Sequence, residues 1–208
     1  MIATPPQPSK VAIDAPFGWP VDFVRAMTDR TVFADQLGQG RRLRLERRET
    51  DHWVHEHETK QPLSVTTDRI AYPAMRTAGL LAALEDRGTE VDRAGTSGLV
   101  CEVYPDPAIR RLGLWPSNAE ARASYKGKDG SAVALRESIV AGLPSALRLD
   151  DDIEARCIAS DDALDALVCA LVARAVMLEQ TTPSPPELIG AAQTEGWIHV
   201  PRDAARLF

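Results

Sequence analysis

Aromatic residues and cysteines are scarce in this chain of 208 residues, and each scarcity excludes a class of structure. Aromatic side chains make up only 5% of the residues, while alanine, leucine and valine are plentiful, which favours helices packed on a sheet over an all-β sandwich. The three cysteines, Cys101, Cys157 and Cys169, are too few and too scattered for a disulfide framework. Because they lie in apolar runs, we expect buried thiols in a reducing compartment.

Long apolar segments are also missing. No run approaches the length needed to cross a bilayer, and the first residues, MIATPPQPSK, lack the apolar region of a signal peptide. We therefore expect a cytoplasmic protein without membrane contact. The sequence has no P-loop, no G-x-S-x-G elbow and no dinucleotide fingerprint. Phosphoryl-transfer enzymes that act on small substrates usually have a glycine-rich phosphate loop, so the sequence does not favour that class.

Positive charge is sparse, because the chain carries a formal net charge of -6. An acidic chain is not steered as a whole toward nucleic acid, so a polyanion would have to meet a local basic patch. The only dense patch lies in the sequence RRLRLERR. It predicts phosphate contacts and a solvated face about equally. The candidate nucleic-acid-binding residues are Arg41, Arg42, Arg44, Arg47, Arg48 and, further along the chain, Lys126.

Apolar runs and capping signals predict an α/β order of elements. Strands are expected at residues 10–15, 99–104 and 197–200. Residues 41–48 alternate basic and apolar side chains, which favours a strand or a loop there. Helices are expected at residues 20–27, 67–84 with an interruption near Pro73, 132–141, 161–178 with Ser160 as N-cap, and in a short segment that ends at Gly196.

Asp14 is the first candidate site residue. It stands at the carboxyl end of a predicted buried strand, where ligands and metals collect in open α/β sheets. The competing interpretation is that Asp14 caps the turn made by Pro16 and Gly18. The residue by itself favours turn capping slightly.

Glu102 is the second candidate, inside the predicted strand VCEVY. An unpaired carboxylate is costly in a strand that is buried on both faces. Either the strand has a solvated face or Glu102 reaches a cation, and the pattern leaves both open.

Asp162 and Asp165 are the third candidate pair, near the start of the strongest predicted helix. Asp165 shares a helical face with Val168, Cys169 and Val172, so its carboxylate needs a partner. A divalent metal or a buried arginine would serve. Carboxylates from two strand ends and one helix start are suitable oxygen ligands for Mg²⁺ or Mn²⁺, which can orient water against a phosphodiester.

Six segments in this order resemble a family of predicted nucleases with an RNase H-like fold, domain of unknown function 429. The segments are VAIDAPFGWP, RETD, CEVYPDPAIRRLGL, SYKG, SDDALDALVCAL and EGWIHVP. The helix acids are also similar to those of RuvC-type nucleases. The resemblance implies a mixed sheet flanked by helices and a catalytic, metal-binding set of Asp14, Glu102, Asp162 and Asp165. Arg48, Thr50, Asp51, Tyr104 and Lys126 match motif positions to which we assign no role.

The resemblance also implies that the chain departs from the family at its beginning. Relatives start with a strand that bears a glycine and a metal-binding aspartate, and residue 1 here falls just before their fourth strand. We therefore expect one truncated domain over residues 1–208, with an irregular insertion at about 30–98. The predicted function is a metal-dependent nuclease, and the alternative is a non-catalytic interaction or regulatory module. The exposed edge of residues 10–15 would favour a homodimer.

Overall fold

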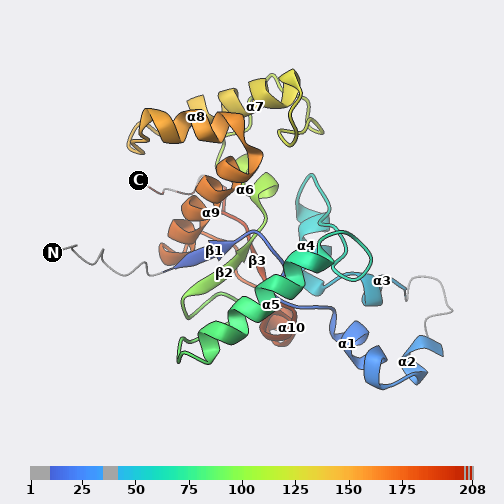
Figure 1. Cartoon of the computed structure of the whole chain (residues 1–208). Coiled ribbons are helices and arrows are strands. Elements are labelled where there is room, and N and C mark those ends of the chain that lie inside the picture. Colours follow the sequence, from blue (N-terminus) through green and yellow to red (C-terminus); the bar gives the residue numbers. More distant parts are fainter. Residues whose placement is uncertain (1–9, 35–41, 204, 206, 208) are drawn as a thin grey trace.

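A small parallel sheet organises the protein. The computed structural model describes residues 10–34, 42–203, 205 and 207. Within these residues the sheet has three strands in the order β1 (Val11–Ile13), β2 (Val100–Val103) and β3 (Ile198–His199) (Figure 1). The register aligns Ala12 with Cys101, and Val103 with His199. Because all three strands are parallel, their carboxyl ends lie at one edge of the sheet.

Alternating side chains divide the sheet residues between two hydrophobic cores. Cys101 and Val103 belong to the larger core, against which Ala12 also packs, whereas Val100 and Ile13 belong to a smaller core on the other face. The next residue after Ile13 is Asp14, so the alternation directs Asp14 toward the larger core. Glu102 is directed to the opposite face.

The helices that enclose the larger core follow β2. The long helix α9 contacts both β1 and β2, and α6 and α8 pack on α9 (Figure 1). This layer consists of α6 (Pro105–Arg111), α7 (Gly130–Ala141), α8 (Asp151–Ala159) and α9 (Asp161–Met177).

The opposite face of the sheet is covered mainly by α5, α4 and α10. Leu81 of α5 packs with Phe17 and Val100, and Val54 of α4 packs with Ile198 of β3. The elements on this side are α1 (Val21–Thr28), α2 (Thr31–Ala34), α3 (Arg42–Glu46), α4 (Glu49–His57), α5 (Ala71–Glu85), the 3-10 helix η2 (Pro186–Leu188) and α10 (Ile189–Glu195).

Local signals explain the boundaries of the helices that flank the candidate site. The Ser160 side chain accepts a hydrogen bond from the Ala163 N–H at the start of α9, and Asp129 accepts from Ser131 and Ala132 at the start of α7. At the end of α10, Gly196 has φ 94°, a conformation that favours glycine. A side chain there would also collide with the Glu102 carboxylate.

The α/β class and the positions of all three predicted strands are confirmed. Several details were wrong. The described strands are parallel rather than mixed, and residues 42–46 form a helix that packs on α1. Pro73 does not interrupt a helix, because it falls in the first turn of α5, where a missing N–H is harmless. The expected irregular insertion carries α2 to α5, and the sequence predicted neither α6 nor α8.

No helix in the described ranges is long and apolar enough to cross a membrane.

A buried arginine connects the sheet to the helices on the α5 side. Arg48 precedes α4, and its Nη1 and Nη2 donate to the two oxygens of Glu102 at 2.8 and 2.7 Å. Its Nε and Nη2 donate to Asp51 at 3.2 and 2.8 Å. Nη1 also donates to the carbonyl of Glu195 at 3.1 Å, and the Phe17 N–H donates to Glu102 at 2.9 Å. Arg48 therefore links β2, α4 and α10 directly, and Glu102 adds the segment after β1.

Burial acts against every charge in this cluster. Arg48 is 1% exposed, Glu102 2% and Asp51 0%. Burial raises the pKa of Glu102, and the adjacent Arg48 opposes that rise. For Arg48, burial lowers the pKa, but Asp51 and Glu102 raise it further, so the guanidinium remains charged. The buried charges balance only when all three residues are present, because removing one of them leaves an uncompensated buried charge.

We expect Arg48→Met to lower the free energy of unfolding by about 3–5 kcal/mol, because it leaves Glu102 and Asp51 buried without a cation. Urea denaturation followed by circular dichroism measures this loss. Arg76→Met on the exposed side of α5 is the matched control and should change stability by less than about 0.5 kcal/mol. Equal stabilities of the two variants would contradict the linking role of Arg48.

Candidate carboxylate site

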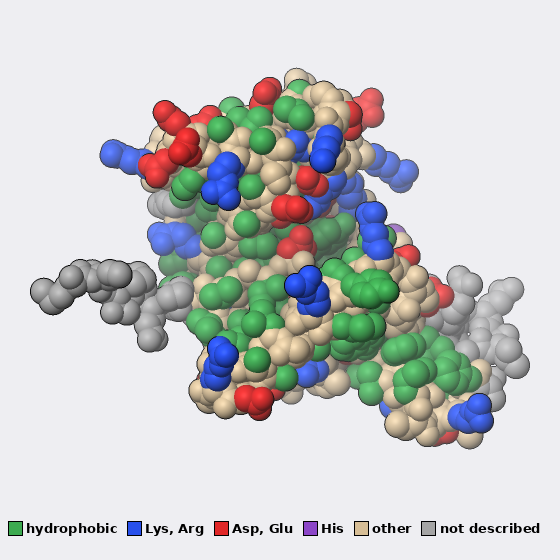
Figure 2. All heavy atoms as spheres, viewed as in Figure 1, with side chains coloured by type: hydrophobic (Ala, Val, Ile, Leu, Met, Phe, Trp, Pro, Cys, Tyr) green, Lys and Arg blue, Asp and Glu red, His purple; other side chains and the backbone are tan. Residues whose placement is uncertain are grey.

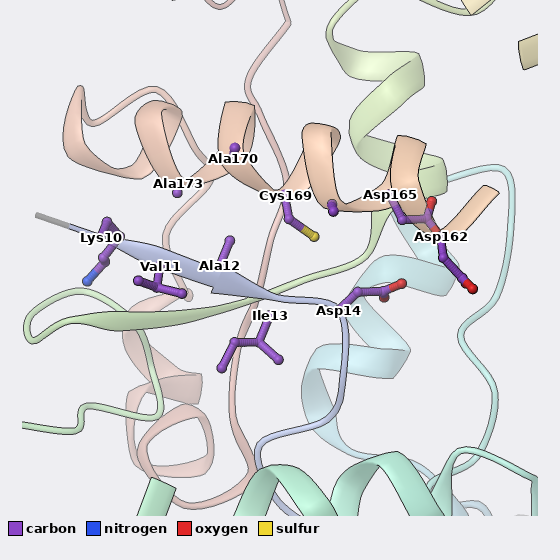
Figure 3. Close-up of a pocket in the computed structure, with 11 residues that line it drawn as sticks. Lys10, Val11, Ala12, Ile13, Asp14, Asp162, Asp165, Cys169, Ala170 and Ala173 are labelled. Atoms are coloured by element: carbon purple, nitrogen blue, oxygen red, sulfur yellow. The ribbon is translucent and has the colours of Figure 1, made fainter. Parts of the chain in front are cut away.

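The end of strand β1 and the start of helix α9 place three aspartates together. Asp14 follows β1 at its carboxyl end, and Asp162 and Asp165 lie in the first turns of α9. Figure 3 shows the three side chains gathered at one end of the space between β1 and α9. The strand alternation and the cap at Ser160 are the local reasons for this arrangement, because they orient Asp14 and fix where α9 begins.

The three aspartates line one end of an open groove of about 590 Å³. One wall is β1 itself, and the other is a line of small side chains on α9 (Figure 3). Besides Asp14, Asp162 and Asp165, the lining residues are Lys10, Val11, Ala12, Ile13, Ala166, Cys169, Ala170 and Ala173. The groove is therefore acidic at one end and apolar along its length.

The three carboxylates differ in their partners. Asp165 is buried, and it accepts a hydrogen bond from the Tyr125 hydroxyl at 2.8 Å and a short one from the Lys126 ammonium. Asp14 and Asp162 are exposed, and no described residue donates a hydrogen bond or an ion pair to either side chain. Two adjacent carboxylates therefore have no cation of their own.

The electrostatics at Asp14 follow from this arrangement. The protein atoms around its carboxylate displace water, and together with the charge on Asp165 they raise its pKa to about 7. Lys126 lowers the pKa, while Glu102 and Asp162 add to the rise. Burial also raises the pKa of Asp165, against the opposing effects of Lys126 and Tyr125. A cation bound beside Asp14 would relieve the repulsion.

Asp14 also borders a second recess, a cleft of about 450 Å³ on the α5 side. Four cationic side chains line it: Arg48, Lys60, Arg69 and Lys126. Lys60 pairs with Asp106 at 2.7 Å. Arg69 is exposed, and it has no hydrogen bond or ion pair with any residue that the structure describes. Asp14 therefore lies where an acidic groove meets a cleft lined by Arg69, whose guanidinium has no partner among the described residues.

On the face seen in Figure 2, acidic and basic side chains adjoin near the middle of the view, below the layer formed by α7 and α8.

Glu102 lines the same cleft as Asp14, but its carboxylate already has a partner. It is close enough to raise the pKa of Asp14, but its carboxylate turns to the opposite face of the sheet and binds Arg48. Of the two alternatives that the sequence left open, a solvated face or a cation, Glu102 has a cation, and that cation is a guanidinium. The geometry does not bring Glu102 into one cation site with Asp14 and Asp165.

The predicted basic patch is not one surface. Arg41 lies outside the described residues, and Arg42 begins α3. Arg44 and Arg47 line a recess beside α10, where Arg47 donates to the carbonyl of Pro62. Arg48 is buried in its ion pairs and has no free donor for a phosphate. Including Arg48 in a nucleic-acid patch was wrong, because alternation in RRLRLERR does not reveal which arginine enters the core.

Sequence reasoning missed Lys60, Arg69 and the role of Tyr125. Tyr125 and Lys126 of the SYKG segment both bind Asp165, which explains why they occur together. Burial and the charge on Asp165 raise the pKa of Tyr125, so it donates as a neutral hydroxyl. Lys60 and Arg69 carried no signal in the sequence, because they lie in the segment between α4 and α5 and meet Asp14 at the cleft only in the folded chain.

The donor chemistry of the groove matches a hard divalent cation in part. Carboxylate oxygens are what Mg²⁺ or Mn²⁺ prefers, and Asp14 and Asp162 are free to offer them. Nevertheless, within residues 10–34, 42–203, 205 and 207 no three His, Cys, Asp or Glu side chains are grouped closely enough to hold a metal ion. The Lys126 ammonium neutralises the third aspartate instead.

Together, the fold and the site define an α/β protein with a carboxylate-lined groove at the carboxyl end of a parallel strand. Residues 1–188 match the model of the family described as "Protein of unknown function (DUF429)", and the chain belongs to this family. No curated protein and no solved structure matches the chain.

Asp14→Asn should stabilise the protein more at about pH 8 than at about pH 4.5. Folded Asp14 keeps its proton up to a pKa of about 7, whereas the unfolded chain loses it near the ordinary value of 3.8. Ionisation of Asp14 therefore lowers stability as pH rises through this window, and asparagine removes that loss. Urea midpoints of both proteins at the two pH values test this. Asp86→Asn, at the exposed end of α5, is the control, and its effect on the urea midpoint should be the same at both pH values. If the effect of Asp14→Asn is also the same at both pH values, the pKa of Asp14 is not raised in the folded protein.

Proposed function

We propose that this protein is a divalent-cation-dependent phosphodiesterase that acts on nucleic acid, with an RNase H-like arrangement of its sheet. One observation carries the proposal: Asp14 and Asp162, which have no partner among the described residues, line one groove, and Asp14 also borders a cleft lined by Arg69, which is likewise without a described partner. Phosphodiester hydrolysis needs both kinds of group, since the substrate is an anion and the developing charge must be stabilised. The family resemblance adds support to the fold but is weak support for chemistry.

In this proposal the cation is Mg²⁺ or Mn²⁺, held by Asp14 and Asp162. When bound, such a cation supplies Lewis-acid stabilisation of the phosphodiester oxygens. Asp165 is a third ligand only if Lys126 moves away from it. The Lys126 side chain is 43% exposed, so it has room to turn toward an incoming phosphate.

The remaining residues bind and orient the substrate. Arg69 attracts the phosphate backbone into the cleft, and Lys60 lies along the same wall, held in place by Asp106. The neighbouring Asp165 and the displaced water raise the pKa of Asp14, and a cation bound by Asp14 would lower it again and keep the carboxylate ionised. Glu102 has a different role, because it stabilises the sheet through Arg48.

A second candidate function is a non-catalytic interaction module on the same fold. The observation that favours it is the ion pair between Lys126 and Asp165, which neutralises one of the three aspartates without a metal. The two functions differ in what the free carboxylates bind. A catalyst binds a divalent cation there, whereas a module binds a basic group of a partner.

We expect nuclease activity that requires Mg²⁺ or Mn²⁺ and disappears with EDTA. Asp14→Asn and Asp162→Asn should each lower the rate by about 100-fold, because each removes a ligand charge worth several kcal/mol in the transition state. Fluorescently labelled single- and double-stranded DNA and RNA are the substrates to test. Asp86→Asn serves as the control. A folded wild-type protein that is inert on all of them, with either metal, would favour the interaction module.

We also expect Arg69→Met to weaken nucleic-acid binding and to reduce its salt dependence. Each phosphate contact releases counterions, so losing one contact lowers the slope of log K against log salt by about 0.7–0.9. Fluorescence anisotropy between about 50 and 200 mM salt measures the slope, with Arg76→Met as control. If both variants keep the wild-type slope, Arg69 does not contact the backbone.

A further inference from the structure

The cleft beside Asp14 has an apolar wall in addition to its charged side chains. The segment between α4 and α5 contributes Pro62, Leu63 and Ile70 to this wall, and Pro73 in the first turn of α5 continues it. Leu63 is 40% exposed, so a large part of its side chain is available to a ligand. The volume of about 450 Å³ is within the range of pockets that bind small organic groups.

Hydrogen bonds hold the apolar wall in place. The Ser64 hydroxyl donates to the carbonyl of Glu46 at 2.7 Å, and the Thr66 hydroxyl donates to the carbonyl of Leu45 at 3.0 Å. The Ser64 N–H donates to the Asp68 carboxylate at 2.7 Å, which closes the turn. The wall is therefore preformed, and a ligand that packs on it does not have to order this segment first.

The polar side of the cleft offers donors to an anion. Asp106 accepts from Lys60 at 2.7 Å and from Arg110 at 2.8 Å, so one carboxylate serves two cations and the three residues carry a net positive charge. Arg69 has no partner among the described residues. The Tyr104 hydroxyl lines the cleft without a described partner either, and burial together with the charge on Asp106 raises its pKa to about 12, so it stays a neutral donor.

We propose that this cleft holds one unpaired nucleotide of the substrate, with its base against Leu63 and Ile70 and its phosphate at Arg69, so that the protein acts on single-stranded nucleic acid. The inference rests on the proposed function, because it takes nucleic acid as the substrate. A nucleotide joins a flat ring system to an anion, and the cleft combines an apolar wall with cationic donors. Lys60 and Tyr104 are further donors for the phosphate and the sugar.

A paired duplex cannot use the apolar wall. Its bases are stacked and paired inside the helix, so it presents mainly phosphates to a protein surface. A base reaches Leu63 only after it leaves the stack, and leaving the stack costs free energy in a duplex but much less in a single strand. Asp14 borders the same cleft, so the phosphate next to the bound nucleotide would lie beside the candidate carboxylates.

Binding without catalysis tests the inference. A labelled oligonucleotide of about ten residues, alone or annealed to its complement, is titrated in EDTA and followed by fluorescence anisotropy. The single strand should bind about tenfold more tightly than the duplex, because only its bases can pack on the wall. Leu63→Ser should remove most of this difference by weakening the single strand alone, and Leu63→Phe should retain it.

Leu80→Ser is the matched control, because Leu80 is an exposed leucine of α5 that does not line the cleft. It should bind both forms like the wild type, and circular dichroism checks that all variants are folded. Equal affinity for single strand and duplex, equal effects of Leu63→Ser and Leu80→Ser, or no binding at all would overturn the inference.

Two further outcomes separate the inference from its alternatives. Adenosine monophosphate should compete only at much higher concentration than the oligonucleotide, and equal competition would overturn the inference by making the cleft a site for a free nucleotide. An oligonucleotide that binds through Leu63 but stays intact with Mg²⁺ or Mn²⁺ would contradict the proposed catalysis and support the nucleotide site. Hydrolysis of single strand and duplex with no preference in binding would support the catalysis and contradict the nucleotide site.

Discussion

The ion cluster around Arg48 is the constraint on which the rest of the structure depends. Its guanidinium binds Glu102 of β2 and Asp51 of α4, and donates to the carbonyl of Glu195 at the end of α10. Segments far apart in the sequence therefore meet at one buried charge. A three-stranded sheet with strands of two to four residues has few ladder bonds of its own, so such a connection matters more here than in a large sheet.

The same cluster distinguishes the carboxylate that stabilises the fold from the carboxylate that can bind a ligand. Glu102 turns to the Arg48 side of the sheet, whereas Asp14, one strand away, turns toward α9. Because the sheet residues alternate between faces, one carboxylate is neutralised in the core and the other is left at an open groove. The raised pKa of Asp14 has the same origin, since water is displaced around it while Asp165 repels it.

The groove beside β1 ends at Asp14 and Asp162, which have no partner among the described residues. In the proposed function a cation between these two carboxylates makes the groove a catalytic site. The cleft with Arg69 lies on the other side of Asp14, so an anionic ligand could approach from there.

The sequence by itself determined the three strands, the start of α9 and the candidates Asp14, Asp162 and Asp165, because alternation, capping and helical spacing are local properties. It could not determine which charges pair. The sequence places Glu102 with the acidic residues, but in the structure Arg48, 54 residues away, binds it. The sequence RRLRLERR predicts a basic surface patch, but Arg48 in it is buried. Lys60 and Arg69, between α4 and α5, meet Asp14 at the cleft only in the folded chain. Long-range pairing of charges is decided by tertiary structure, because it depends on which faces the packed elements turn toward each other.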